Sequence, residues 1–274
     1  MSKAVVTRYE ITTEYPVPEP ITVAHVSDLH SRRAGDILDL LRSAHPDIIV
    51  VTGDTLERYD NRPQYDFYRK PIKRLIINIV HYTNYLLNLL RRDENKAHTK
   101  YAFEFFKEAV RVAPVYISLG NHEQKLFDSD LRFYAEHGIT LLDNAAVRAS
   151  VRGFDMNIGG MSSWEFDEFL DDFAHREGFK LLLCHHPERF EPLIQDTPID
   201  LTLSGHTHGG QVRIGKKGRG FFVPGQGLFG KYARGRFFGG RLIVSAGCSN
   251  TVAMPRLFNP RELVVITLKG KEKG

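Results

Sequence analysis

The chain has 274 residues, of which 42% are apolar and 26% are charged, a balance typical of soluble globular proteins rather than of disordered or fibrous ones. Its formal net charge of +4 is small, so anionic partners are allowed but not required. Cys184 and Cys248 cannot build a disulfide framework, and they favour a reducing compartment. The N-terminus shows no signal-peptide pattern, and no apolar run reaches the ~18 residues of a membrane-spanning helix. We therefore expect one large domain, residues 1–274, located in the cytoplasm.

The first elements along the chain form a βαβ unit. Apolar runs at 21–26 and 47–52 predict two strands, and leucine and isoleucine within 36–44 predict a short helix between them. Polar residues follow both runs, at the end of the strand where ligands collect in open α/β sheets. The unit therefore points to a binding site at the carboxyl ends of its strands.

The segment at about 57–112 is expected to be a helical insertion. Apolar residues recur at helical spacing from Ile72 to Leu90, flanked by lysine and arginine. One interpretation is a helix on a membrane surface with basic ends. The other, which is favoured, is a helix that packs on the core with its charged ends in solvent. A second helix is expected over 99–112, leading into a strand at 115–119.

The remainder of the chain predicts further strands and helices. Helices are expected at 130–137 and 164–175. Strands are expected at 139–142, 145–151, 154–158, 180–184, 200–204, 220–223, 241–246 and 262–268. Two groups of strands with helices between them indicate an α/β fold in which two sheets face each other and helices lie outside.

Five of the apolar runs end in residues that bind metal ions. Asp-Leu-His occupies 28–30, Gly-Asp 53–54, Gly-Asn-His-Glu 120–123, a histidine pair 185–186 and Gly-His-Thr-His-Gly-Gly 205–210. Carboxylates and imidazoles are transition-metal ligands, and glycine at a turn allows a close approach of the backbone. We expect these strand ends to converge on one polyvalent metal site.

The five motifs, in this order, resemble the pattern of the calcineurin-like metallophosphoesterase family. The longer form Gly-His-Thr-His-Gly-Gly-Gln, through Gln211, is similar to a YkuE-like bacterial branch of it. The resemblance implies one metallophosphoesterase domain with the fold of that family. This fold is a four-layer αββα sandwich of two mixed β-sheets.

The resemblance also implies a two-metal centre. For the first metal it implies the ligands Asp28, His30, Asp54 and His208. For the second it implies Asp54, Asn121, His185 and His206. Asp54 would bridge the two ions, because a carboxylate has two oxygens to share. His122 matches the family histidine that contacts the phosphate and assists the leaving group while a metal-bridging hydroxide attacks phosphorus.

Two details of this centre depend on the residue types. A mixed nitrogen and oxygen ligand set suits Mn, Fe, Zn or Co more than Ca or Mg, and Mn²⁺ is the first choice. His185 and His186 compete for one ligand position, and the family spacing, with the ligand two residues before Pro187, selects His185. Glu123 is expected to orient its loop rather than to bind metal.

The stretch 209–240 interleaves glycine, aromatic and basic residues beside the expected site. It could grip a nucleotide or nucleic acid by stacking and phosphate contacts, or enter a membrane and take a lipid phosphate. A third interpretation is a glycine-rich loop whose rings pack under the second sheet. We expect a phosphorylated small molecule or lipid as substrate, with a peripheral contact at the inner membrane face as an option. Nucleic acid is less favoured, because the net charge is low.

Three functions follow from these patterns. The first is a dinuclear metal-dependent hydrolase of a small-molecule or lipid-linked phosphoester or pyrophosphate. The second is a nuclease or cyclic-nucleotide phosphodiesterase. The third is a non-catalytic metal-binding scaffold, which the complete ligand set disfavours. The sequence indicates no protein partner.

Overall fold

The computed structural model describes residues 3–58, 99–163, 166–214, 219–249 and 256–271, which form two mixed six-stranded sheets. The first sheet contains, in spatial order, β1 (Val5–Thr13), β16 (Glu262–Gly270), β2 (Ile21–Val26), β3 (Ile48–Thr52), β4 (Val115–Ser118) and β5 (Thr140–Leu142). The second contains β14 (Gly235–Phe237), β15 (Leu242–Val244), β9 (Leu201–Ser204), β8 (Phe179–Cys184), β7 (Phe154–Met161) and β6 (Ala145–Val151).

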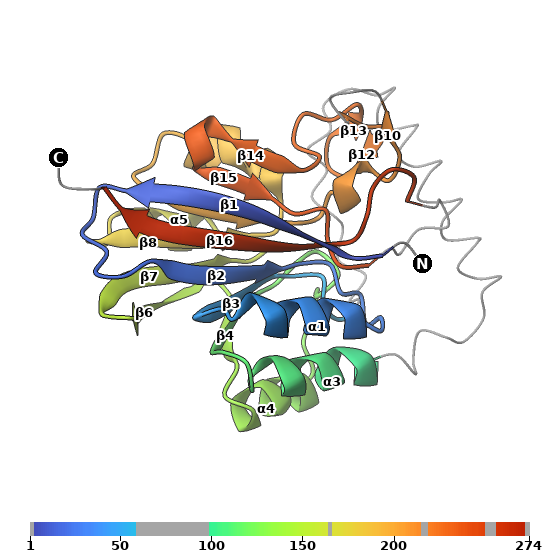
Figure 1. Cartoon of the computed structure of the whole chain (residues 1–274), viewed down its shortest axis with the longest axis horizontal. Coiled ribbons are helices and arrows are strands. Elements are labelled where there is room, and N and C mark those ends of the chain that lie inside the picture. The colour runs from blue at the N-terminus through green and yellow to red at the C-terminus, as the bar shows by residue number, and fades with distance from the viewer. Residues whose placement is uncertain (1–2, 59–98, 164–165, 215–218, 250–255, 272–274) are drawn as a thin grey trace.

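Helices cover the outer face of each sheet. They are α1 (Gly35–Ala44), α3 (Thr99–Ala109), α4 (Asp128–Glu136) and α5 (Asp167–Ala174). The first three share an apolar core with the first sheet, and Figure 1 shows them gathered on one side of it. The second sheet packs its outer face against α5 and the helical turns at 187–194. A third core lies between the sheets, where β3 and β4 contact β7 and β8. The predicted αββα sandwich is therefore confirmed.

The strands that carry the motifs run parallel to one another. In the first sheet β2, β3, β4 and β5 are parallel, and in the second β7, β8, β9 and β15 are parallel. All five residues of β3 are buried, as expected for a continuous apolar strand covered on both faces. The carboxyl ends of both sets face the same end of the sandwich, where the loops that follow them meet.

Three segments differ from the expected elements. The helix expected at 164–175 begins only at Asp167, after a cap at Phe166. The strand expected at 220–223 is divided between two short hairpins, β10 (Arg213–Ile214) with β11 (Arg219–Gly220), and β12 (Phe222–Val223) with β13 (Gly227–Leu228). Of the expected insertion at 57–112, α3 is a helix, and residues 59–98 lie outside the described part. Among the described helices, none combines the length and the apolar character needed to cross a membrane.

The packing of the two sheets can be tested where β7 contacts β5. A Cβ on Gly160 would lie 2.2 Å from the carbonyl oxygen of Leu142, so Gly160→Ala must push the two strands apart. We expect a loss of about 2–3 kcal/mol in the free energy of unfolding, measured by urea denaturation. Gly35→Ala is the matched control, because a Cβ there meets no atom within 4 Å. Equal midpoints for the two variants would contradict this account of the sheet packing.

Candidate metal centre

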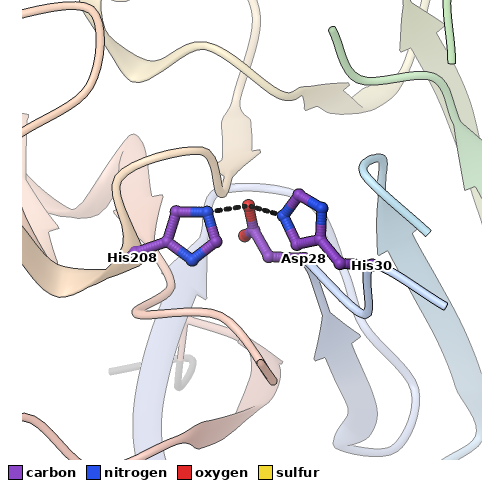
Figure 2. Close-up of side chains that lie close together, drawn as sticks. All are labelled: Asp28, His30 and His208. Carbon is purple, nitrogen blue, oxygen red and sulfur yellow. Dashed lines mark ion pairs between the residues drawn. The ribbon is translucent and has the colours of Figure 1, made fainter. Parts of the chain in front are cut away.

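One cluster of the predicted residues surrounds Asp28, which directly follows β2. Its Oδ1 lies 3.8 Å from Nε2 of His30 and 3.6 Å from Nε2 of His208. Figure 2 shows the two imidazoles approaching the carboxylate from opposite sides. Their rings are stacked, with centroids 5.1 Å apart. The three ligand atoms lie close enough together to share one cation.

A second cluster surrounds Asp54, which follows β3. Its Oδ2 lies 3.1 Å from Nε2 of His185, a residue supplied by the second sheet, and 3.7 Å from Nε2 of His30. His206 completes a group of three with Asp54 and His185. One carboxylate therefore faces both clusters, which is the position that a bridging ligand needs.

The remaining two predicted residues follow β4. Asn121 is 8% exposed, and its Oδ1 is buried with no hydrogen-bond partner in the described part of the chain. The neighbouring His122 is more open, with 23% of its side chain exposed, and its Nε2 lies 3.8 Å from Asp54 Oδ2. The backbone N–H of His122 donates to the other oxygen of Asp54, at 2.9 Å. The loop after β4 thus brings an amide oxygen and an accessible imidazole to the edge of the cluster.

Contacts at Nδ1 orient the rings of two of the predicted histidine ligands. Nδ1 of His30 contacts Glu57 Oε1 at 2.8 Å, and that of His185 contacts the Thr52 carbonyl at 2.6 Å. Such contacts hold a ring proton on Nδ1, so that Nε2 is the atom directed inward. Nε2 of both histidines is buried without a hydrogen bond among the described residues. Buried polar atoms normally form hydrogen bonds, and these two Nε2 atoms instead face the carboxylates of Asp28 and Asp54, an arrangement that fits the binding of divalent metal ions.

The backbone at the ligand positions is itself unusual. A positive φ is uncommon for residues other than glycine and usually marks a functional constraint. Five predicted ligands have one, with values of 56° at Asp28, 49° at His30, 53° at Asp54, 67° at His206 and 47° at His208. The strand ends are therefore held in turns that aim the side chains at one place.

The electrostatics of the site keep its carboxylates charged. Burial opposes ionisation of Asp28, but the nearby His208 and His30 hold its pKa below the usual range. Burial lowers the pKa of His208 to about 3, so this imidazole is neutral and able to bind a cation. Burial also disfavours charge on His185, but Asp54 outweighs it and raises the pKa of His185 to about 9. A cation that binds His185 must therefore displace a proton.

Glu123 lies behind the cluster and organises its loops. One carboxylate oxygen accepts from the backbone N–H groups of Asp54 and Gly120, each at 2.8 Å. The other accepts from the backbone and hydroxyl of Thr55 and from the N–H of Leu56. The side chain therefore ties the loop after β3 to the loop after β4.

Glu57 is a site residue that the sequence patterns missed. Its carboxylate joins two predicted residues, with Oε1 at 2.8 Å from His30 Nδ1 and Oε2 at 2.8 Å from His122 Nδ1. Burial disfavours the charged form of His122, but Asp54 and Glu57 outweigh this and raise its pKa to about 10. The sequence signal that could have identified Glu57 is its position three residues after Asp54, in the same strand-end loop.

His186 has partners of its own on the other side of the cluster. Its Nε2 lies 3.0 Å from Ser163 Oγ and its Nδ1 lies 3.2 Å from Glu188 Oε1. Its ring centroid is 4.4 Å from that of His206. The structure thus directs His185 toward Asp54, while His186 lies beside Ser163, Glu188 and His206.

The role of Glu123 can be tested by a change of one atom. Glu123→Gln removes the charge and sets amide hydrogens against N–H donors, so we expect a loss of about 2–4 kcal/mol in the free energy of unfolding. Urea denaturation measures it, with Glu136→Gln on the exposed face of α4 as the matched control. An unchanged midpoint for Glu123→Gln would show that the loops do not depend on this carboxylate.

Comparison with known proteins agrees with this geometry. The family model of the calcineurin-like phosphoesterases matches residues 21–210. YpbG, an uncharacterized protein of Bacillus subtilis, is 27% identical over 262 residues, which are 92% of this chain and 83% of YpbG. YkuE, an uncharacterized metallophosphoesterase of the same species, is 24% identical over 250 residues, 90% of this chain and 76% of YkuE.

A shorter match is to the Escherichia coli phosphodiesterase YaeI, which is 30% identical over 132 residues, 43% of this chain and 48% of YaeI. The family model spans more than half of the chain and includes the motif residues from Asp28 to His208. The chain is therefore a member of the calcineurin-like phosphoesterase family, a family of metal-dependent hydrolases.

Proposed function

We propose that this phosphoesterase hydrolyses phosphate esters or pyrophosphates at a centre of two divalent metal ions. The observation that carries the proposal is the Asp54 carboxylate, whose Oδ2 lies 3.7 Å from Nε2 of His30 and 3.1 Å from Nε2 of His185. In the proposed assignment the first metal is held by Asp28, His30, Asp54 and His208. The second is held by Asp54, Asn121, His185 and His206.

Two bound metal ions neutralise charge at phosphorus and provide a nucleophile at neutral pH. The chain supplies the negative charge that retains them, because Asp28 and Asp54 are fully buried carboxylates with depressed pKa values. The imidazoles, once metal binding has displaced the proton of His185, would complete the ligand sets without adding positive charge beside a phosphate. The mixed nitrogen and oxygen donors favour Mn²⁺, and Fe, Zn and Co suit the same set.

His122 is proposed to protonate the leaving oxygen. Its Nδ1 is fixed by Glu57 at 2.8 Å, which leaves Nε2 at the open edge of the cluster. The same two carboxylates that raise its pKa keep the imidazole protonated at neutral pH, the state of a general acid. Glu57 acts through this contact and is a positioning residue.

The other functions considered for the chain gain less support. The ligand set is complete, which disfavours a silent scaffold. A nuclease or cyclic-nucleotide phosphodiesterase would use the same centre, and the phosphodiesterase YaeI among the relatives makes diesters the first substrates to assay.

The proposed function can be tested on metal-stripped protein to which Mn²⁺ is restored. We expect Mn²⁺-dependent hydrolysis of bis-p-nitrophenyl phosphate, together with about two bound metal ions per chain in elemental analysis. Asp54→Asn should abolish turnover and lower metal content, because it removes the shared carboxylate. Asp39→Asn, on an exposed part of α1, is the matched control. Wild-type protein that binds no stoichiometric metal and hydrolyses nothing would overturn the proposal.

The role of His122 predicts a dependence on the leaving group. His122→Asn should lower kcat by about 10²–10⁴-fold for an alkyl phosphodiester, whose leaving oxygen needs a proton, and much less for a p-nitrophenyl ester. Glu57→Gln should lower kcat for both substrates, as His122→Asn does, but by a smaller factor. Metal content should stay unchanged in His122→Asn. Equal losses for both leaving groups would show that His122 is not the acid.

A further inference from the structure

A long segment near the C-terminus contains no acidic residue. Between Asp200 and Glu262 there is neither aspartate nor glutamate, while ten residues are lysine or arginine. The basic residues are Arg213, Lys216, Lys217, Arg219, Lys231, Arg234, Arg236, Arg241, Arg256 and Arg261. Because the whole chain carries only +4, the remainder is net acidic, and the positive charge is concentrated in this segment.

The same segment carries most of the exposed large apolar side chains of the described residues. Five belong to it, and the other two, Phe127 and Leu131, lie at α4. The five are Phe221 (36% exposed), Leu228 (47%), Phe229 (53%), Leu257 (47%) and Phe258 (88%). We refer to these five residues as the apolar tip surface.

The residues of the apolar tip surface lie on neighbouring stretches of backbone. The N–H of Phe229 donates to the carbonyl of Phe221, and the N–H of Phe221 donates to the carbonyl of Val212. Val212 in turn pairs with Leu257 in a parallel bridge. The rings of Phe221 and Phe229 meet edge to face, with centroids 5.6 Å apart. Since paired strands lie about 4.8 Å apart, the surface is continuous, and Figure 1 places β10, β12 and β13 together at one corner of the molecule.

Two of the rings are held outward by a strained backbone. Phe229 and Phe258 each have a φ of 54°, in a region that bulky residues seldom adopt. Such conformations persist where the surrounding structure enforces them, and they concentrate at functional positions. The fold therefore keeps two phenylalanine rings in contact with water at some conformational cost.

The side chain of Asn259 links the apolar tip surface to the metal centre. Asn259, which follows Phe258, donates from Nδ2 to the carbonyl of His208 at 2.7 Å and to that of Gln211 at 3.2 Å. His208 is a proposed ligand of the first metal. Hydrogen bonds therefore connect the loop that carries the apolar tip surface to the loop that carries His208.

We propose that the apolar tip surface docks the protein on an anionic phospholipid bilayer. Phenylalanine and leucine side chains enter the boundary between headgroups and acyl chains, and a basic surround is attracted to anionic lipids. The segment has ten basic residues and no acidic one, and three of the ten, Lys231, Arg234 and Arg261, pair with carboxylates from other parts of the chain. The excess of positive charge that the segment keeps fits that surface. The inference extends the proposed function, because Asn259, next to Phe258, contacts the loop of the proposed ligand His208, and docking would bring that loop close to lipid phosphoesters.

The test uses the full chain and sedimentation with lipid vesicles. We expect binding to phosphatidylglycerol-containing vesicles that weakens with added salt and is far lower for pure phosphatidylcholine vesicles. Phe258→Ser should reduce the bound fraction, and Phe229→Ser combined with Phe258→Ser should lower the partition coefficient by at least about tenfold. Leu131→Ser, at an exposed apolar residue on α4 (45% exposed), is the matched control and should change nothing.

Hydrolysis of soluble bis-p-nitrophenyl phosphate separates this inference from the proposed function. Both Phe variants should retain it, which also shows that they fold. Vesicle binding that is absent in active wild-type protein, or that survives both substitutions, would overturn the docking surface and leave the hydrolase in place. A dimer of the wild type that dissociates in Phe258→Ser, measured by light scattering, would assign the surface to a second copy and would also overturn the proposal.

Discussion

The carboxylate of Asp54 joins the two halves of the fold. It is supplied by the first sheet, yet its Oδ2 lies 3.1 Å from Nε2 of His185, which follows a strand of the second. A fully buried carboxylate costs several kcal/mol unless positive charge or hydrogen bonds compensate it. The N–H of His122 provides part of this compensation, and a cation would provide more. Metal binding at this point therefore also stabilises the packing of the sheets, because the ligands come from both.

The surrounding loops show how closely the chain is folded around this group. A Cβ on Gly120 would lie 2.1 Å from Asp54 Oδ1, and one on Gly53 would lie 2.2 Å from the nitrogen of Gly120. These two glycines allow the loops after β3 and β4 to touch, and Glu123 then ties them together. The predicted ligands adopt positive φ values that residues other than glycine seldom take. The hydrogen bonds of residues behind them, such as Glu123, offset the conformational cost.

The convergence of the motif residues is predictable from sequence because each follows an apolar run, and parallel strands bring their carboxyl ends together. Glu57 is harder to find, because its role depends on two imidazoles that approach it from different loops. Asn259 is harder still, since it is 51 residues from the His208 carbonyl that it binds. The expected strand at 220–223 failed for a local reason. Glycine at 220, 225 and 227 favours tight hairpins, and two pairs of short strands form instead.

The pairing of the first and last strands constrains how the molecule is made. β16 lies between β1 and β2, so the first sheet has a gap until residues 262–270 have been synthesised. The loop before β16 is needed as well, because Ser249 Oγ donates to the carbonyl of Asp28 at 2.8 Å. During translation the early motifs therefore emerge from the ribosome well before the parts that enclose them. Closure of the metal centre is therefore a late event that cannot precede the synthesis of residues 262–270.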